Sequence, residues 1–235
     1  MIPRTLAAVA TVPGREAALS LCLESLRPQV EKLHVICHDM TDPPAAVRAL
    51  ADRWVCEPDR HGSAAGLRWS LTHQGLYLKC DDDWIYPPDY VGTMLRWVRR
   101  WRGRALVACH GRVLKRFATG FLDVDAAWSP MTEQKANWAN YPGCCGVAWD
   151  TRLRVPAAVP GKNLEEPHLA VWAQRRRVPI FLLPHAADWL RYVLDDAAPG
   201  APTIWRQAKA SGFTERNRPI AEYSNRREWR VFRCR

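Results

Sequence analysis

Three consecutive aspartates, Asp81, Asp82 and Asp83, follow a short apolar run at residues 76–80. Two carboxylates about 4 Å apart repel each other by roughly 4 kcal/mol at an effective dielectric constant of about 20. A chain that gathers three of them beside buried apolar residues therefore needs a cation to neutralise them. Carboxylate oxygens suit Mg²⁺ or Mn²⁺, ions that commonly also hold the phosphates of a substrate. The alternative is a solvated acidic turn that binds no ion.

The elements that must position these carboxylates alternate between strand and helix patterns. Alternating strands and helices predict an α/β fold with a mostly parallel sheet flanked by helices on both faces. Ligands of such sheets bind at the carboxyl ends of the strands. Residues 11–15 and the three aspartates both follow strands, so we expect them to share one crevice. Apolar runs predict strands over residues 5–11, 33–37, 53–56, 76–80, 105–109 and 179–183, and helical spacing predicts helices over 19–26, 45–51, 62–72, 87–101 and 163–177.

Two segments depart from this alternation. Residues 115–145 lose periodicity and contain several aromatic residues, which predicts a lid or a binding loop. Residues 215–235 hold seven arginines and three glutamates, interleaved with aromatic side chains. Arginines mixed with aromatic rings are typical of segments that contact phosphates and stack on bases.

The composition suits one sizeable domain or a domain with a C-terminal extension. The chain has 235 residues, of which 48% are hydrophobic, and a formal net charge of +10. Such a charge indicates a polyanionic partner, although a GC-rich genome, which inflates the arginine content, would also produce it. The eight cysteines form no CxxC pair, and neither a signal peptide nor a long apolar run is visible. These features predict a cytoplasmic protein, in the bacterial host cell if a phage encodes it.

Four pieces of the chain occur in the order and spacing of a known enzyme family. On these pieces, residues 5–193 resemble glycosyltransferases of the GT-A fold, family 2-like, of the phage and bacterial type. The resemblance implies a GT-A (Rossmann-like) domain at residues 1–195, with a nucleotide-sugar-binding half at 1–110 and an acceptor half at 111–195, and a basic C-terminal extension at 196–235. The four pieces are residues 11–15 (TVPGR), 61–68 (HGSAAGLR), 81–83 (DDD) and 86–90 (YPPDY).

In the resembling enzymes a divalent cation holds the diphosphate of a nucleotide-sugar. The resemblance implies that Asp83, assisted by Asp81, binds Mn²⁺ or Mg²⁺, and that Asp82 could replace either. His185 follows a strand where some GT-A enzymes supply a further metal ligand, although a structural role is the alternative. The nucleotide-sugar contacts implied by the resemblance are Thr11, Pro13, Arg15, Asp39, Gly62, Arg68, Asp81 and Asp82.

Two adjacent glutamates stand at the start of the predicted helix at residues 163–177. In inverting members of the family a carboxylate just before this helix takes the proton from the acceptor hydroxyl. The resemblance therefore implies Glu166 as the catalytic base, with Glu165 as second choice, and favours an inverting reaction. A base of this kind contributes about 10²–10⁴-fold to the rate. The alternative is that acidic residues at a helix N-terminus serve stability alone.

The basic tail suggests the acceptor. We expect a nucleic acid, such as a hydroxymethylated base in phage DNA, contacted by Arg226, Arg227, Trp229 and Arg230. An alternative acceptor is a lipid-linked or cell-surface glycan. A different class remains open, namely a metal-dependent nuclease or a non-catalytic nucleic-acid-binding protein, since an acidic cluster in basic surroundings also fits those. The sequence indicates neither which sugar and nucleotide are used nor the oligomeric state.

Overall fold

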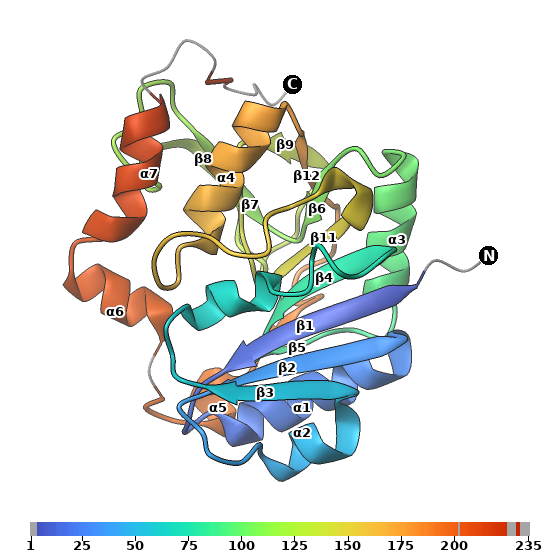
Figure 1. The fold of residues 1–235 in the computed structure, drawn as a ribbon. Coiled ribbons are helices and arrows are strands. Elements are labelled where there is room, and N and C mark those ends of the chain that lie inside the picture. Colours follow the sequence, from blue (N-terminus) through green and yellow to red (C-terminus); the bar gives the residue numbers. More distant parts are fainter. Residues whose placement is uncertain (1–3, 202, 225–228, 231–235) are drawn as a thin grey trace.

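The computed structural model describes residues 4–201, 203–224 and 229–230. Its centre is an eight-stranded sheet in the order β3-β2-β1-β4-β11-β6-β12-β9 (Figure 1). The strands β3, β2, β1 and β4 are parallel, as are β6 and β12, whereas β11 and β9 run antiparallel to their neighbours. The strands are β1 (Thr5–Thr11), β2 (Lys32–His38), β3 (Arg53–Glu57), β4 (Leu76–Asp81), β6 (Leu106–Ala108), β9 (Asn137–Ala139), β11 (Gly146–Asp150) and β12 (Ile180–Leu182).

Helices and two small sheets surround this centre. One small sheet has the order β10-β7-β8 and the other pairs β13 with β5. Their strands are β5 (Trp84–Ile85), β7 (Gly111–Leu114), β8 (Val124–Ala127), β10 (Tyr141–Pro142) and β13 (Arg191–Tyr192). The helices are α1 (Glu16–Leu26), α2 (Ala45–Leu50), α3 (Tyr90–Arg100), α4 (Glu165–Arg176), α5 (Leu194–Ala197), α6 (Ile204–Ala210) and α7 (Thr214–Ser224), with 3₁₀ turns η1 (Arg27–Gln29), η2 (Gly62–Leu67) and η3 (Thr151–Leu153).

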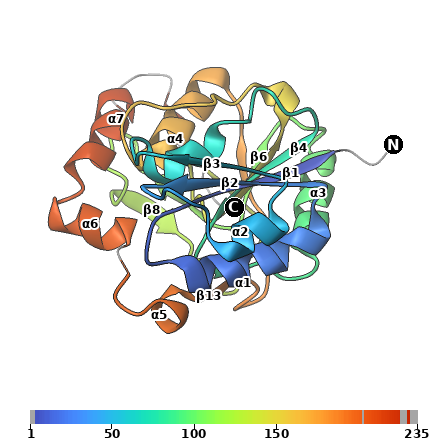
Figure 2. The same cartoon turned by 60° about the horizontal axis from the view of Figure 1, so that its bottom comes forward.

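Both faces of the sheet are buried because its central strands are apolar on both faces. In β1, Ala7 and Val9 pack into a cluster that includes side chains of α1, α2 and α3. The alternate residues Leu6 and Ala8 point the other way, into a cluster with η2 and α4. Figure 2 shows α1 and α2 on one side of the sheet and α4 on the other. This arrangement confirms the predicted α/β class and the mostly parallel, doubly covered sheet.

Two predictions about local structure were wrong. The segment predicted as a helix over residues 62–72 is a 3₁₀ turn, η2, followed by further turns. Its first residue, Gly62, has a φ of +56°, and Arg68 N–H donates to the carbonyl of Ala65, three residues back. The segment 115–145, predicted to be a lid or a binding loop, is not a loop throughout, because it contains β8, β9 and β10. Strands of two to four residues are too short to show a hydrophobic period, so the sequence pattern could not reveal them.

The C-terminal helices pack onto the rest of the chain. Ile220 of α7 and the buried Trp229 join a third apolar cluster with Ala170 of α4, Phe121 and Tyr141. The backbone N–H of residue 230 donates to the side chain of Gln174 in α4. Within the described residues, no helix is both long and apolar enough to cross a membrane.

We predict that protonation of a buried histidine contributes to acid destabilisation. His34 is 8% exposed and its ring meets Trp69 edge-on at 4.6 Å. Burial, helped by Arg53 and Lys32, lowers the pKa of His34 to about 4. Between the ordinary histidine pKa of about 6.5 and that value, only the unfolded chain takes up the proton, so stability falls as the pH falls.

In urea titrations at pH 7 and pH 4, we expect the wild type to lose about 1–2 kcal/mol more stability than His34→Leu. This figure is below the full linkage value because the folded protein also takes up the proton near pH 4. Equal losses in the two proteins would contradict the prediction.

Candidate active site

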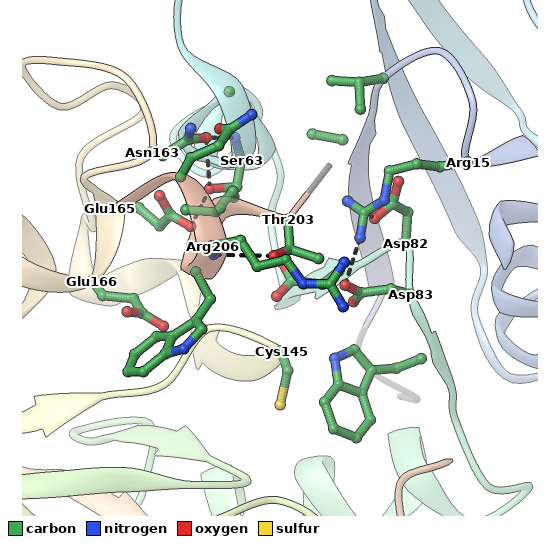
Figure 3. A pocket seen from close by; sticks show the side chains of 18 of the residues that line it. Arg15, Ser63, Asp82, Asp83, Cys145, Asn163, Glu165, Glu166, Thr203 and Arg206 are labelled. Atoms are coloured by element: carbon green, nitrogen blue, oxygen red, sulfur yellow. Dashed lines mark hydrogen bonds and ion pairs between the residues drawn. The ribbon is translucent and has the colours of Figure 1, made fainter. Parts of the chain in front are cut away.

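A cavity of about 990 Å³ opens at the carboxyl ends of β1 and β4. The register of these parallel strands sets Ala10 beside Asp81, so the residues that follow both strands meet at one edge of the sheet. The three aspartates, Glu165 and Glu166 all line the cavity. In Figure 3, Asp82 and Asp83 lie across the cavity from the two glutamates, which α4 supplies. The structure therefore brings the predicted metal site and the predicted base together.

An arginine and a threonine of the protein form ion pairs and a hydrogen bond with two of the aspartates. Arg15 Nη1 lies 2.7 Å from Asp82 Oδ1, and Arg15 Nη2 lies 2.5 Å from Asp83 Oδ2. The hydroxyl of Thr11 donates to Asp82 Oδ2 at 2.6 Å. Arg15 and Thr11 come from the segment after β1 and from its last residue, which explains why the TVPGR piece and the aspartates belong to one unit.

A buried lysine neutralises the remaining aspartate and reaches across to α4. Lys79 is fully buried and forms an ion pair with Asp81 Oδ1. Its Nζ also lies 3.3 Å from Glu165 Oε1, which accepts a 2.6 Å hydrogen bond from the hydroxyl of Ser63. The carbonyl of Cys144 accepts a further bond from the same Nζ at 3.3 Å. Glu165 is therefore tied into a buried network.

Burial dominates the protonation of the aspartates. Desolvation raises the pKa of Asp81 and of Asp83, and each of these is raised further by a neighbouring aspartate. Asp83 Oδ1 is buried and has no hydrogen-bond partner in the described part of the chain. Among the described residues, no group of three or more His, Cys, Asp or Glu side chains is placed to hold a metal ion by itself. Asp83 thus presents a free carboxylate oxygen, and a cation there would need oxygens from substrate or water.

Glu166 sits in a more polar environment than Glu165. Its Oε2 lies 3.0 Å from Arg216 Nη2 and accepts from the hydroxyl of Tyr141 at 3.1 Å, and its Oε1 accepts from the backbone N–H of Cys144 at 3.0 Å. Burial alone would raise the pKa of Glu166, but Arg216, His110 and the Cys144 N–H outweigh it and lower the pKa. The carboxylate is therefore ionised at neutral pH, and its partly exposed edge faces the cavity.

A thiol and an imidazole also meet at the cavity wall. Cys145 Sγ lies 3.2 Å from His110 Nδ1. Burial raises the pKa of the Cys145 thiol well above its ordinary value, and burial lowers the pKa of His110 to about 4. Both groups are neutral at pH 7, so this pair is not a thiolate nucleophile.

The other predicted contacts divide into two groups. Pro13, Asp39 and Gly62 line the cavity with the residues already described. At Gly62 a Cβ atom would come within 1.8 Å of Asn163 Oδ1, so only glycine allows this approach. By contrast, the structure does not bring Arg68 to the cavity; its guanidinium binds Glu57 at 2.5 Å.

Three further predicted residues also lie elsewhere. His185 borders a different cleft, and both its ring nitrogens contact backbone carbonyls, at 2.8 and 3.0 Å. Trp229 is 4% exposed, so its ring is not available to stack on a base, and Arg230 is absent from the cavity lining. Arg226 and Arg227 lie outside the described residues.

Sequence reasoning missed several cations of the site, among them Lys79, Arg112 and Arg216. Lys79 had a recognisable signal, a single lysine inside an otherwise apolar strand. Arg112 and Arg216 carry no such signal, because they come from β7 and α7 and meet the cavity only through the packing of these elements.

Comparison with known proteins bears on the fold. No protein-family model matches the chain, and no curated protein matches its sequence. Among solved structures it is similar to glucosyl-3-phosphoglycerate synthase from Mycobacterium tuberculosis in complex with Mn²⁺, UDP-glucose and phosphoglyceric acid, at 16% identity and a TM-score of 0.63, over 94% of this chain and 80% of that chain. This chain therefore has a GT-A-like fold.

Two further solved structures are similar to this chain in fold. The same synthase with Mn²⁺, UDP and glucosyl-3-phosphoglycerate is 15% identical over 88% of this chain and 75% of that chain, with a TM-score of 0.58. A mycobacterial protein is 19% identical over 81% of this chain and 67% of that chain, with a TM-score of 0.57. Another match to the synthase spans only 43% of that chain, with a TM-score of 0.38.

We predict that Lys79 is essential for the stability of this GT-A-like fold. Lys79→Met would leave the buried carboxylate of Glu165 and the partly exposed carboxylate of Asp81 without a counter-charge, and breaking a buried pair in this way costs about 3–5 kcal/mol. Urea unfolding at pH 7 measures the loss. The matched control is Lys115→Met, because Lys115 is half exposed and pairs with Asp123 at the surface. We expect the control to lose less than about 1 kcal/mol, and similar losses in both variants would contradict a structural role for Lys79.

Proposed function

We propose that this protein is a metal-dependent glycosyltransferase that moves a sugar from a nucleotide-diphosphate sugar to a hydroxyl acceptor. The observation that carries the proposal is the meeting, in one cavity, of Arg15 and the three aspartates with Glu166 on the opposite wall. The similarity in fold to a synthase crystallised with Mn²⁺ and UDP-glucose supports it. A nuclease has no need of the TVPGR segment at this edge of the sheet.

The donor occupies the half of the cavity that follows β1 and β4. Asp83, with its buried and unpartnered Oδ1, would hold Mn²⁺ or Mg²⁺, and Asp81 would assist. When bound, the cation neutralises charge on the diphosphate leaving group. Arg15 adds a positive charge beside the same oxygens, while Pro13, Asp39 and Gly62 line the space left for the nucleoside.

The acceptor enters from the side of α4. Its hydroxyl oxygen attacks the anomeric carbon of the donor sugar as the bond from that carbon to the diphosphate breaks. The nucleoside diphosphate leaves with the bonding electron pair, and Glu166 takes the hydroxyl proton. The position of Glu166 across the cavity from Asp82 and Asp83 supports inversion of configuration. Glu165 is less suited to this task because its side chain is only 3% exposed, against 18% for Glu166.

The nucleic-acid acceptor stays a prediction. The buried ring of Trp229 does not support base stacking there. A glycan acceptor also stays an alternative. A screen that offers hydroxymethylpyrimidine DNA and lipid-linked glycans together with small hydroxyl compounds would separate these acceptors.

We predict that a nucleotide-sugar stabilises the protein only when Mn²⁺ is present. At a donor concentration about 100 times its Kd, binding contributes about 2.7 kcal/mol, which raises the Tm by about 5–10 °C. A thermal-shift screen of UDP-, GDP-, ADP- and CMP-linked sugars with and without Mn²⁺ measures this effect. Asp83→Asn should abolish it, and Asp123→Asn, at an exposed surface pair, should retain it. Stabilisation by none of the donors, or equal stabilisation without metal, would contradict the proposal.

We predict separate effects for the two glutamates. Glu166→Gln should lower kcat by about 10²–10⁴-fold, as expected when a general base is lost, while donor stabilisation in the thermal-shift assay is retained. Glu165→Gln should mainly lower the Tm, because it leaves the buried Lys79 with one carboxylate fewer. Release of nucleoside diphosphate measures kcat. A larger loss of kcat in Glu165→Gln than in Glu166→Gln would reverse the assignment of the base.

A further inference from the structure

The end of the cavity beside Glu166 combines cations with aromatic rings. Arg112 from β7 and Arg216 from α7 both line it. The guanidinium carbons of these residues lie 4.7 and 5.5 Å from the centroid of the same ring, that of Phe121. We call the site formed by Arg112, Phe121 and Arg216 the arginine end of the cavity. The ring centroid of Trp205 lies 5.9 Å from the guanidinium carbon of Arg112, and Trp128 also lines the cavity.

The arginine end carries more positive charge than its own carboxylate compensates. Glu166 is already paired with Arg216 at 3.0 Å. Arg112 donates to the carbonyl of Phe121 at 3.1 Å, and no carboxylate of the described residues lies within 4.0 Å of its guanidinium.

Arg216 itself is incompletely satisfied. Its side chain is 10% exposed, and its Nε has no hydrogen-bond partner in the described part of the chain. Glu166 stabilises the charge of Arg216, whereas Arg112 has no carboxylate partner among the described residues, and a partly buried cation without a counter-charge is unfavourable. A negative group from a ligand would therefore be stabilised between these two arginines.

We infer that the arginine end binds an anionic group of the acceptor, which is then a small hydroxyl compound carrying a phosphate monoester or a carboxylate. This inference rests on the proposed glycosyltransferase function and names the acceptor class. A planar guanidinium matches both groups, because two parallel N–H donors face two oxygens. The rings of Trp128 and Trp205 offer apolar surface to the carbon skeleton of the acceptor.

Binding of the anion at the arginine end would bring the acceptor hydroxyl close to Glu166, the proposed base of sugar transfer. Arg216 contacts Glu166 directly, so an anion held by Arg112 and Arg216 places the rest of the acceptor beside that carboxylate. An acceptor fixed through its anion can present its hydroxyl to Glu166 in a defined orientation, which accelerates a bimolecular step. Arg112 is thus an acceptor-binding residue that determines specificity.

Inorganic phosphate tests the arginine end without catalysis. In isothermal titration of phosphate into the full-length protein, Arg112→Gln should weaken binding by about tenfold or more, and Arg112→Lys should retain part of the affinity. Arg116→Gln is the matched control, since Arg116 also lies over a phenylalanine, 5.2 Å from the Phe117 centroid, but outside the cavity lining. Phosphate binding that is lost in Arg15→Gln and unchanged in Arg112→Gln would place the anion on the donor side and overturn the inference.

A transfer assay with the stabilising donor tests the acceptor class. We expect kcat/KM for glucose 6-phosphate or glucuronate to exceed that for glucose by about 100-fold or more, because a site built for an anion rejects the neutral analogue. That ratio should fall by about tenfold in Arg112→Gln and stay unchanged in Arg116→Gln. The better of the two anionic acceptors distinguishes phosphate from carboxylate.

Equal transfer to glucose, or transfer to DNA alone, would overturn the inference and leave the glycosyltransferase proposal intact. If none of the three sugars is an acceptor, the phosphate titration decides. Failure of the proposed function is recognised separately, by the absence of any metal-dependent stabilisation by a nucleotide-sugar.

Discussion

The site depends on the compensation of three neighbouring carboxylates at the buried end of β4. Asp82 is 1% exposed and is held by Arg15 and Thr11 from the end of β1, while Asp81 is held by Lys79 from within β4 itself. An uncompensated charge in such a position costs several kcal/mol. The acids and cations are therefore stable only together, and the parallel pairing of β1 with β4 is the condition under which they meet.

The same compensation gives two adjacent glutamates different surroundings. Glu165 lies 3.3 Å from the buried Lys79 Nζ and is tied to the wall that holds the aspartates. Glu166 points to the opposite side of the helix start, where Arg216 and Tyr141 hold it ionised beside the cavity. Glu165 is thus fixed in a buried network, whereas Glu166 keeps a partly exposed edge at the cavity. Because Arg216 comes from α7 and Trp205 from α6, the C-terminal helices form part of the cavity wall.

Patterns of regular period made much of the fold predictable from the sequence. The strand over residues 5–11 was predicted with its observed bounds, and the helix over 87–101 contains α3. The helix predicted over residues 62–72 was wrong, because Gly62 adopts a left-handed backbone conformation that the sequence pattern does not show. The strands within 115–145 were not predicted, because strands of two to four residues leave no periodic signal. For the site, the aspartates could be named from their place at a strand end, and the resemblance to a known family pointed to Arg15 and the two glutamates. The same resemblance pointed to Arg68, which binds Glu57 instead.

By itself the sequence determined the α/β class and the acidic group that needs counter-charge, because apolar period and the local density of carboxylates are properties of neighbouring residues. Only the tertiary structure decided which cations supply that charge. Arg15 lies 67 positions before Asp82, and Arg216 lies 50 positions after Glu166, so no local pattern links them. Such pairs are selected by the packing of β1, β4, α4 and α7 and by the cost of leaving a buried charge alone.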